Sequence, residues 1–417
     1  MRILYNIILK CYEFVIQMAA ILGNKKASQF TKGRKQWDSK LRSALKNNPE
    51  NRIWFHCASL GEFEQGRPLI KKIRLEFPDA FLLLTFFSPS GYEIRKNYLG
   101  VDFVSYLPLD TRKNSKLFLD ILNPNQTFFI KYEFWFYFID ELKKRGKSVY
   151  IISANFRPNQ LFFKWYGTFF RKIIQKITHI FVQDLNSIRL LQSIQVKNAS
   201  VSGDTRFDRV VEISKSTNQS EKLLLFKGDN KLLVAGSTWS EDEEIILQTY
   251  FNDKHVGYKI VIAPHEINEE HLKNIESRIS TLSKKKNCFR FTEKETDFTL
   301  GIMILDTIGQ LSSVYGYADI TYIGGGFGKG IHNILEPAAY GKPVIFGPNY
   351  YKFREATELV KLGAAFSIID QKEYSSVLNS LMNDPDRRIM AGRKSKKYIS
   401  NNIGATQIIF SFVYNRK

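Results

Sequence analysis

The sequence predicts an α/β protein with two doubly wound domains, each a parallel sheet with helices on both faces. Short apolar runs alternate with longer amphipathic segments along most of the chain, and a strand followed by a helix, repeated often, is typical of such a sheet. The alternation is interrupted at residues 201–208, which read Val-Ser-Gly-Asp-Thr-Arg-Phe-Asp, and then starts again. At 417 residues the chain is also too long for one core.

The individual elements follow from these runs. Apolar runs predict strands in the first half at 52–57, 81–86, 102–106, 127–130, 148–153 and 179–183, and in the second half at 231–235, 258–263, 301–305, 319–323, 343–346 and 364–369. Residues from 384 onward are expected to be helical. We therefore expect a membrane-interface helix at 1–24, domains at 25–208 and 209–390, and a C-terminal helical segment at 391–417 that packs back across the domains.

The amino-terminal 22 residues predict an amphipathic helix. Polar side chains recur every three or four positions and so share one stripe, namely Arg2, Asn6, Lys10, Glu13 and Gln17. A cleavable signal peptide requires an uninterrupted apolar run, and a spanning helix requires about 20 residues nearly free of charge. The pattern favours a helix lying in a membrane interface. A helix docked on the protein itself and a single spanning helix are the alternatives.

The charge balance points to anionic partners. Lysine and arginine exceed aspartate and glutamate by 61 to 41, which gives a net charge of +20. Such an excess fits a membrane surface, a nucleic acid or an acidic substrate. No aromatic RNA-binding motif or helix-turn-helix pattern supports nucleic acid. The three cysteines have no metal or disulfide spacing.

A glycine-rich stretch at residues 322–348 predicts a nucleotide site in the second half. It reads as a strand, a glycine-rich turn from Gly324 to Gly330, a helix start at Glu336, and a second strand. Glycines let backbone amides approach a ligand, although glycine-rich turns are also common as simple turns. The Walker pattern, the HExxH zinc motif and the GxSxG elbow are all absent. We therefore expect metal-independent chemistry without a cofactor.

Other polar groups follow the predicted strands, where ligands gather in open α/β sheets. In the second half Ser237 and Thr238 could hold a phosphate or cap a helix, and His265 could contact a phosphate or lie on the surface. In the first half Glu62 is a candidate general base, or a carboxylate that only complements a helix dipole. Glu133 lies among aromatic residues, so it is either satisfied by hydrogen bonds or functional.

Five motifs in order along the chain resemble one family. They read His56-Cys-Ala-Ser-Leu-Gly-Glu-Phe63, Tyr132-Glu-Phe-Trp135, Ser202-Gly-Asp-Thr-Arg-Phe-Asp208, Gly236-Ser-Thr238 and His332-Asn-Ile-Leu-Glu-Pro-Ala-Ala339. The chain resembles the Kdo (3-deoxy-D-manno-octulosonic acid) transferases of lipopolysaccharide biosynthesis. The resemblance implies a GT-B glycosyltransferase with two Rossmann-like domains facing across a cleft. It also implies transfer of Kdo from CMP-Kdo to the lipid A precursor (lipid IVA), at the cytoplasmic face of the inner membrane.

The resemblance also implies roles for individual residues. Glu62 would deprotonate the acceptor in an inverting displacement, with Glu133 as a second catalytic residue and with Ser59 and Gly61 on the acceptor side. The donor side would comprise Ser237, Thr238, His265, Gly324, Gly325, Gly326, Lys329, Asn333 and Glu336. The family's Pro-Arg-His reads Pro264-His265-Glu266 here, so His265 or Lys329 is expected to replace the arginine.

Two other readings of the sequence stay open. One is a different GT-B enzyme that uses a UDP-sugar, either a transferase or an epimerase, and release of UDP rather than CMP would identify it. The other is a non-enzymatic binder of anionic lipid or nucleic acid, which the positive charge alone permits. Under that reading, replacing Glu62 with glutamine would leave function intact.

Overall fold

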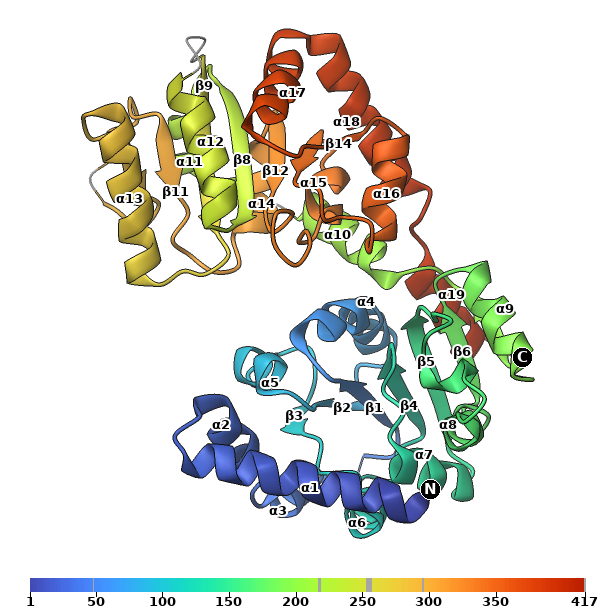
Figure 1. Ribbon diagram of the computed structural model, residues 1–417. Coiled ribbons are helices and arrows are strands. Elements are labelled where there is room, and N and C mark those ends of the chain that lie inside the picture. The colour runs from blue at the N-terminus through green and yellow to red at the C-terminus, as the bar shows by residue number, and fades with distance from the viewer. Residues whose placement is uncertain (48, 217–218, 253–256, 295, 416–417) are drawn as a thin grey trace. The chain divides into compact units, whose positions relative to one another are not determined.

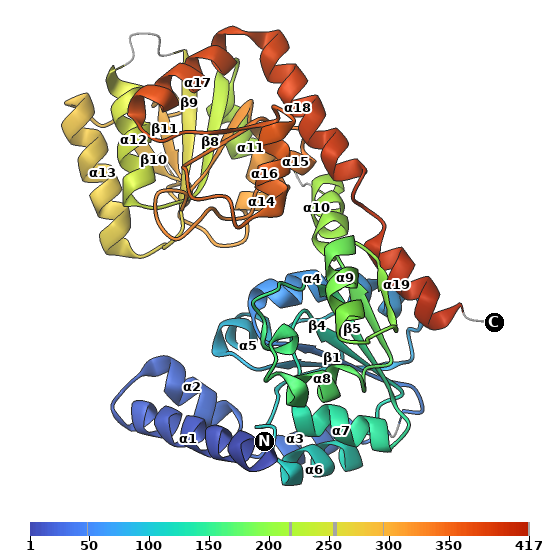
Figure 2. The same ribbon diagram turned by 45° about the vertical axis from the view of Figure 1, so that its right-hand side comes forward.

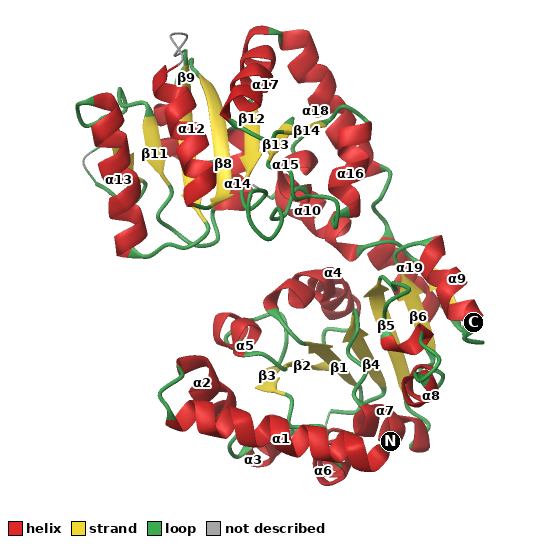
Figure 3. Cartoon of the chain, in the orientation of Figure 1, coloured by secondary structure: helices red, strands yellow, loops and turns green. Residues whose placement is uncertain are grey.

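The computed structural model describes residues 1–417 apart from 48, 217–218, 253–256, 295 and 416–417. Each predicted domain contains some of these positions, and the last two fall in the predicted C-terminal segment, so those parts lie outside the described residues. The chain divides into a first unit, residues 1–209 with 403–417, and a second unit, residues 210–402. Each unit is a parallel sheet between helices, which confirms the predicted α/β class (Figures 1 and 3).

The first unit contains a seven-stranded parallel sheet in the order β3-β2-β1-β4-β5-β6-β7. Its strands are β1 (Arg52–Cys57), β2 (Phe81–Phe86), β3 (Phe103–Tyr106), β4 (Gln126–Ile130), β5 (Ser148–Ala154), β6 (His179–Val182) and β7 (Ala199–Val201). Connecting helices are α4 (Leu60–Glu76), α5 (Pro89–Arg95), α6 (Arg112–Leu122), α7 (Phe136–Lys144), α8 (Thr168–Ile174) and α9 (Leu185–Ser193). The short edge strand β7 was not predicted, because a three-residue strand carries no apolar run.

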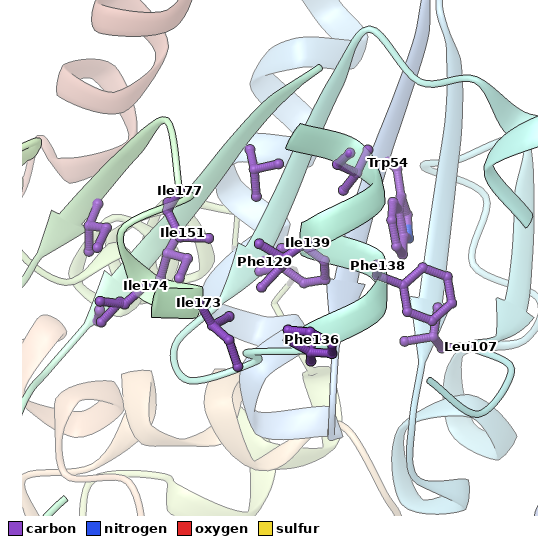
Figure 4. Packing of buried hydrophobic residues seen from close by; sticks show 14 of the residues in the cluster. Trp54, Leu107, Phe129, Phe136, Phe138, Ile139, Ile151, Ile173, Ile174 and Ile177 are labelled. Carbon is purple, nitrogen blue, oxygen red and sulfur yellow. The ribbon is translucent and has the colours of Figure 1, made fainter. Parts of the chain in front are cut away.

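Apolar side chains cover both faces of this sheet. On one face, residues of β1, β4 and β5 pack against α6, α7 and α8, including Trp54, Phe129 and Phe138 (Figure 4). On the other face, α4 and the C-terminal helix α19 (Ala405–Tyr414) bury Ile70 and Ile409. Burial on both faces explains why these strands read as continuous apolar runs.

The amino-terminal helices belong to the first unit. They are α1 (Arg2–Ile21), α2 (Lys25–Gly33) and α3 (Trp37–Ala44). The Tyr5 hydroxyl donates to Asp110 Oδ2 at 2.5 Å, and the Tyr137 hydroxyl donates to Asn6 Oδ1 at 2.8 Å. These bonds hold one edge of α1 on the loop after β3 and on α7, although no residue of α1 is fully buried. By length and composition alone, α1 could also cross a membrane.

The second unit repeats the architecture with the order β10-β11-β9-β8-β12-β13-β14. Its strands are β8 (Lys231–Thr238), β9 (Tyr258–Pro264), β10 (Cys288–Arg290), β11 (Ile302–Ile304), β12 (Ile320–Ile323), β13 (Val344–Phe346) and β14 (Ala365–Ser367). Strand β10, at the edge of the sheet, was also not predicted from the sequence. All pairs in the two sheets are parallel, for example β8 with β9 and β12.

Helices again cover the second sheet. They are α11 (Glu221–Lys227), α12 (Ser240–Asn252), α13 (Glu269–Ser283), α14 (Leu311–Val314), α15 (Leu335–Ala339), α16 (Arg354–Lys361), α17 (Gln371–Asn383) and α18 (Pro385–Ser400). Helices α12, α13 and α17 bury Ile246, Ile275 and Leu378 against one face of the sheet. Figure 2 shows these three helices beside β8 and β9. Helix α10 (Thr205–Lys215) spans the division between the units.

The C-terminal helix packs within the first unit. Phe77, at the end of α4, lies 4.8 Å from Tyr414 and 6.2 Å from Phe410 between ring centroids. The Asp208 carboxylate accepts hydrogen bonds from the backbone N–H groups of Gly404 and Thr406. These bonds join Asp208 to a segment that begins 196 positions later in the chain, at Gly404.

Candidate functional site

In the first unit, the candidate residues lie where the strand order reverses. Strands β1 and β4 are neighbours in the sheet although two strands separate them in the chain. Ligands of doubly wound sheets bind at the carboxyl ends of strands at such a switch point. Glu62 follows β1 at the start of α4, and Glu133 follows β4. The fold thus brings the two predicted catalytic carboxylates to neighbouring strand ends.

Glu62 occupies the third position of α4 and reaches back to the helix start. Ser59 is the residue that precedes the helix, with φ −142° and ψ 172°. Glu62 Oε2 accepts a hydrogen bond from Ala58 N at 2.5 Å. Glu62 also accepts from the backbone N–H of Ser59, and a glutamate at the third helical position commonly caps a helix in that way. Glu62 therefore lies at the start of the helix and hydrogen-bonds to it, as the alternative role for Glu62 requires.

The pKa of Glu62 nevertheless lies near neutrality. Burial raises it most, and the charge of Glu133 raises it further. Hydrogen bonds from Ala58 and Ser59 and the charge of Lys131 lower it, and the balance gives a pKa of about 7. A carboxylate with a pKa near the working pH suits general base catalysis. The capping role and a role as a base are therefore compatible.

Glu133 lies beside two ring nitrogens, those of Trp135 and His56. Trp135 Nε1 donates to Glu133 Oε2 at 2.8 Å, and His56 Nε2 lies 3.3 Å from the same oxygen. His56 is completely buried, and its Nδ1 lies 2.8 Å from the hydroxyl of Thr85. That hydroxyl also accepts from Trp54 Nε1 at 2.8 Å. A chain of polar groups therefore runs from the core to Glu133.

The two predicted acceptor-side residues, Ser59 and Gly61, lie in the same turn. The Ser59 side chain makes no capping hydrogen bond. A Cβ added to Gly61 would meet no atom within 4 Å. The protein itself therefore does not require a glycine there, and the space above the first turn of α4 is open.

His56 and Lys131 were not among the predicted site residues. His56 stands at the end of a buried strand, where a polar side chain needs a partner. Lys131 has a left-handed φ of 62° directly after β4. That conformation is uncommon for lysine. The burial of His56 within an apolar strand was the available signal; nothing local marked Lys131.

In the second unit, the corresponding switch point lies between β8 and β12. The buried Asp242 carboxylate joins the segments that leave these strands. It accepts hydrogen bonds from Trp239 N and Gly325 N, each at 2.9 Å, and from the Tyr322 hydroxyl at 2.6 Å. The structure shows that it fixes the glycine-rich loop to the turn after β8.

Thr238 also belongs to a buried network. Its hydroxyl donates to Glu243 Oε1 at 2.9 Å, and His271 Nε2 lies 2.9 Å from the same oxygen. Ser237 has a left-handed φ of 54°. The Thr238 hydroxyl hydrogen is therefore directed to Glu243, while Ser237 occupies a constrained turn.

The glycines of the loop allow close contact between backbone segments. A Cβ on Gly324 would lie 2.2 Å from the carbonyl oxygen of Ser237, and one on Gly326 would lie 2.5 Å from Gly347 N. Gly324 N donates to Gly236 O at 2.9 Å, and Gly325 N is bound to Asp242. These two amides are therefore engaged within the protein, and the glycines are required for packing.

Three rings meet at the ends of β8, β9 and β12. The rings of His265 and His332 are stacked with centroids 4.2 Å apart. Trp239 Nε1 donates to His332 Nε2 at 3.1 Å. Burial, together with the neighbouring His265, lowers the pKa of His332 to about 4. His332 is therefore neutral at physiological pH.

The remaining predicted donor-side residues lie at the end of the loop. Asn333 Nδ2 donates to Glu336 Oε1 at 2.9 Å, and the Ser312 hydroxyl donates to Glu336 Oε2 at 2.6 Å. Lys329 is exposed in the same loop. The nine predicted donor-side residues thus gather in the second unit, and the four from the first half gather in the first unit. Within the described residues, no group of three or more histidine, cysteine or acidic side chains could hold a metal ion.

The fold defines the class of protein. Two doubly wound units with polar groups at both switch points form a GT-B fold. A solved UDP-GlcNAc 2-epimerase from Neisseria meningitidis, bound to UDP-GlcNAc, has the same fold with a TM-score of 0.63 and 16% identity. The match covers 88% of this chain and 100% of that one. At this identity the likeness shows the fold alone.

Sequence comparison shows which family the chain is similar to. Residues 35–209 match the family model for 3-deoxy-D-manno-octulosonic-acid transferase. The enzyme of that name from Chlamydophila psittaci is 29% identical over 83% of this chain and 81% of its own. The one from Rickettsia prowazekii is 27% identical over 84% of this chain and 76% of its own. The chain is a relative of the Kdo transferases, as its motifs predicted, and these similarities support a glycosyltransferase.

Proposed function

We propose that the protein transfers Kdo from CMP-Kdo to the lipid A precursor (lipid IVA) in lipopolysaccharide biosynthesis. The transfer inverts the anomeric configuration and uses no metal. The similarity to Kdo transferases supports the sugar and its donor. The observation that carries the mechanism is the half-buried Glu62, whose pKa of about 7 lets it act as a base near neutral pH.

In the proposed reaction, Glu62 removes the proton from an acceptor hydroxyl. The hydroxyl oxygen then attacks the anomeric carbon of Kdo from the face opposite the phosphate. As the new C–O bond forms, the bond to the phosphate oxygen breaks, and CMP leaves with the electron pair. Glu133, held by Trp135 and His56, is the second carboxylate of this site and keeps the pKa of Glu62 high.

The donor is assigned to the second unit. We assign the nucleotide to the end of the sheet where the strand order reverses and where Ser237, Thr238 and the loop from Gly324 to Gly326 lie. Asn333 and Glu336 are joined by a hydrogen bond, and the Glu336 carboxylate can accept from ribose hydroxyls. Because Thr238 donates to Glu243, we assign it the role of shaping the turn.

The protein is proposed to act at the cytoplasmic face of the inner membrane. Apolar side chains of α1 remain exposed along one stripe, including Ile3, Ile7, Phe14 and Ile21 at 51–77%. This stripe is distinct from the edge of α1 that carries Tyr5 and packs on the protein. Such a helix suits the interface of a bilayer.

Basic residues accompany this helix. A groove of about 780 Å³ between α1, α6 and α7 is lined by Arg2, Lys10, Arg112, Lys113, Lys116 and Lys144, and by the acidic Glu13, Asp140 and Glu141. Cations near a bilayer attract anionic lipids by about 1 kcal/mol each. The groove therefore favours an anionic surface, as does the net charge of +20.

The test is incubation of the purified protein with CMP-Kdo and lipid IVA, followed by mass analysis of the lipid and assay of CMP. We expect addition of Kdo, release of CMP and no effect of EDTA. Glu62→Gln should reduce turnover by roughly 10²–10⁴-fold. Glutamine can cap a helix at this position as glutamate does, so the variant should fold normally. Glu76→Gln, at the exposed end of the same helix, is the matched control.

Turnover of Glu62→Gln equal to that of the wild type would contradict the mechanism. The fold similarity to a UDP-GlcNAc 2-epimerase motivates one alternative, an enzyme that uses a UDP-sugar. Incubation with UDP-GlcNAc separates the two functions. Conversion of UDP-GlcNAc or release of UDP, with no reaction of CMP-Kdo, would replace the proposed function with that alternative.

A further inference from the structure

Trp239, His265 and His332 form an aromatic stack at three adjacent strand ends of the second unit. Trp239 follows β8, His265 follows β9, and His332 ends the glycine-rich loop after β12. The Trp239 ring lies 4.9 Å from that of His265 and 6.5 Å from that of His332, with interplanar angles of 32° and 15°. The three rings are therefore nearly parallel. Trp239 is 37% exposed and His265 is exposed, so solvent reaches the stack.

Trp239 determines which nitrogen of His332 carries the proton. An indole N–H is only a donor, so Nε2 of His332 must accept at the 3.1 Å contact. In neutral His332 the proton therefore lies on Nδ1, which is left to donate. Among the residues that the structure describes, none accepts from Nδ1. The N–H at Nδ1 is available to a ligand.

The stacked His265 ring opposes protonation of His332. His265 contributes to the low pKa of His332, although burial contributes more. On the same segments, Asp242 is buried with a raised pKa and binds Trp239 N and Gly325 N, while Glu243 is bound by His271 and Thr238. Glu266 and Lys329 are exposed. The carboxylates of Asp242 and Glu243 are thus occupied, and an incoming anion would meet two imidazoles.

We propose that the His265–His332 pair, with its tautomer set by Trp239, binds the phosphate of the nucleotide donor and takes up one proton from solvent when the phosphate binds. His332 Nδ1–H donates to a phosphate oxygen, and the anion offsets the repulsion that otherwise opposes a charge on the stack. The pair thereby supplies the positive charge that an arginine would supply. This inference rests on the proposed function, because it assumes a CMP-linked donor in this unit.

Calorimetry on the full-length protein tests this proposal. CMP and cytidine, which lacks the phosphate, are titrated in buffers of different ionisation enthalpy at neutral pH. We expect CMP binding to show net proton uptake and cytidine binding to show none. His265→Asn and His332→Asn should abolish the uptake and weaken CMP roughly tenfold or more, while cytidine affinity stays unchanged. Free CMP has the same protonation in both titrations at one pH, so the difference between variant and wild type reports protons held by the bound complex.

Two further variants identify the contributing groups. Trp239→Phe keeps an aromatic ring but removes the N–H. It should weaken the affinity for CMP roughly fivefold. The exposed Trp165 of the first unit provides the control Trp165→Phe, which should change nothing. Lys329→Ala should leave the proton uptake intact. If only Lys329→Ala loses the difference in affinity between CMP and cytidine, the proposal is overturned, and the lysine binds the phosphate instead.

The failures of the two proposals are distinguishable. If the wild type and His265→Asn take up the same number of protons when CMP binds, the role of the histidines is overturned. The proposed function would still stand. A wild-type protein that binds neither CMP nor cytidine would overturn the donor assignment, and the role of the histidines with it.

Discussion

Glu133 Oε2 lies 3.3 Å from Nε2 of the fully buried His56, although the two residues are 77 positions apart in the sequence. The N–H of Trp135 reaches the same oxygen. The polar chain from Trp54 through Thr85 and His56 therefore ends on the carboxylate whose charge raises the pKa of Glu62.

The first prediction concerns the pH dependence of turnover. A base must be deprotonated, so activity should fall as pH decreases through the pKa of Glu62, about 7. Glu133→Gln removes a negative charge, so Glu62 loses its proton more easily and the acidic limb should move to lower pH. The measurement is kcat against pH, normalised to its plateau. Glu76→Gln should leave the limb in place, and an unmoved limb in Glu133→Gln would refute the coupling.

The second prediction concerns Gly61. Alanine there meets no atom within 4 Å and is a better helix former, so Gly61→Ala should stabilise the fold by about 0.5–1 kcal/mol. If the acceptor passes over the first turn of α4, the added methyl group should displace it and reduce turnover by up to roughly 100-fold. Thermal unfolding and a steady-state assay separate the two effects. Gly257→Ala, with equally open surroundings, is the control, and full activity in Gly61→Ala would remove Gly61 from the site.

The third prediction concerns Asp242. Asparagine has one carbonyl oxygen in place of a carboxylate that serves three donors. At least one buried donor then lacks a partner, so Asp242→Asn should destabilise the second unit by about 1–3 kcal/mol and weaken CMP. Urea unfolding and calorimetry measure these changes. The exposed Asp229 supplies the control Asp229→Asn, and normal stability together with normal CMP affinity would show that Asp242 is dispensable.

The fourth prediction concerns α1. Ile7 and Phe14 are 51% and 63% exposed, so Ile7→Asp with Phe14→Asp should leave the unfolding free energy nearly unchanged. The same pair should reduce binding to anionic vesicles by at least roughly tenfold, because it charges the apolar stripe. Vesicle sedimentation measures the binding. Gln17→Asp adds a charge to the polar stripe of the helix and should bind almost normally. Equal binding by the wild type, the double variant and Gln17→Asp would argue against insertion of the apolar stripe.

The sequence was sufficient for the architecture because the signals for it are local. Residues 52–57 and 231–235 read as buried strands from their own composition, and β1 and β8 include them. The strands β7 and β10 were missed because three residues at a sheet edge, such as Ala199–Val201, bury too little to leave a pattern.

The sequence by itself determined two α/β domains, the polar residues at the strand ends and the motifs that resemble Kdo transferases. Only the tertiary structure decided what those residues contact. It joined Asp242 to Gly325 across 83 positions, stacked His265 on His332 and raised the pKa of Glu62. The physical reason is that apolar periodicity is written locally in the chain. Hydrogen-bond partners and the burial of a charge depend instead on segments that only the fold brings together.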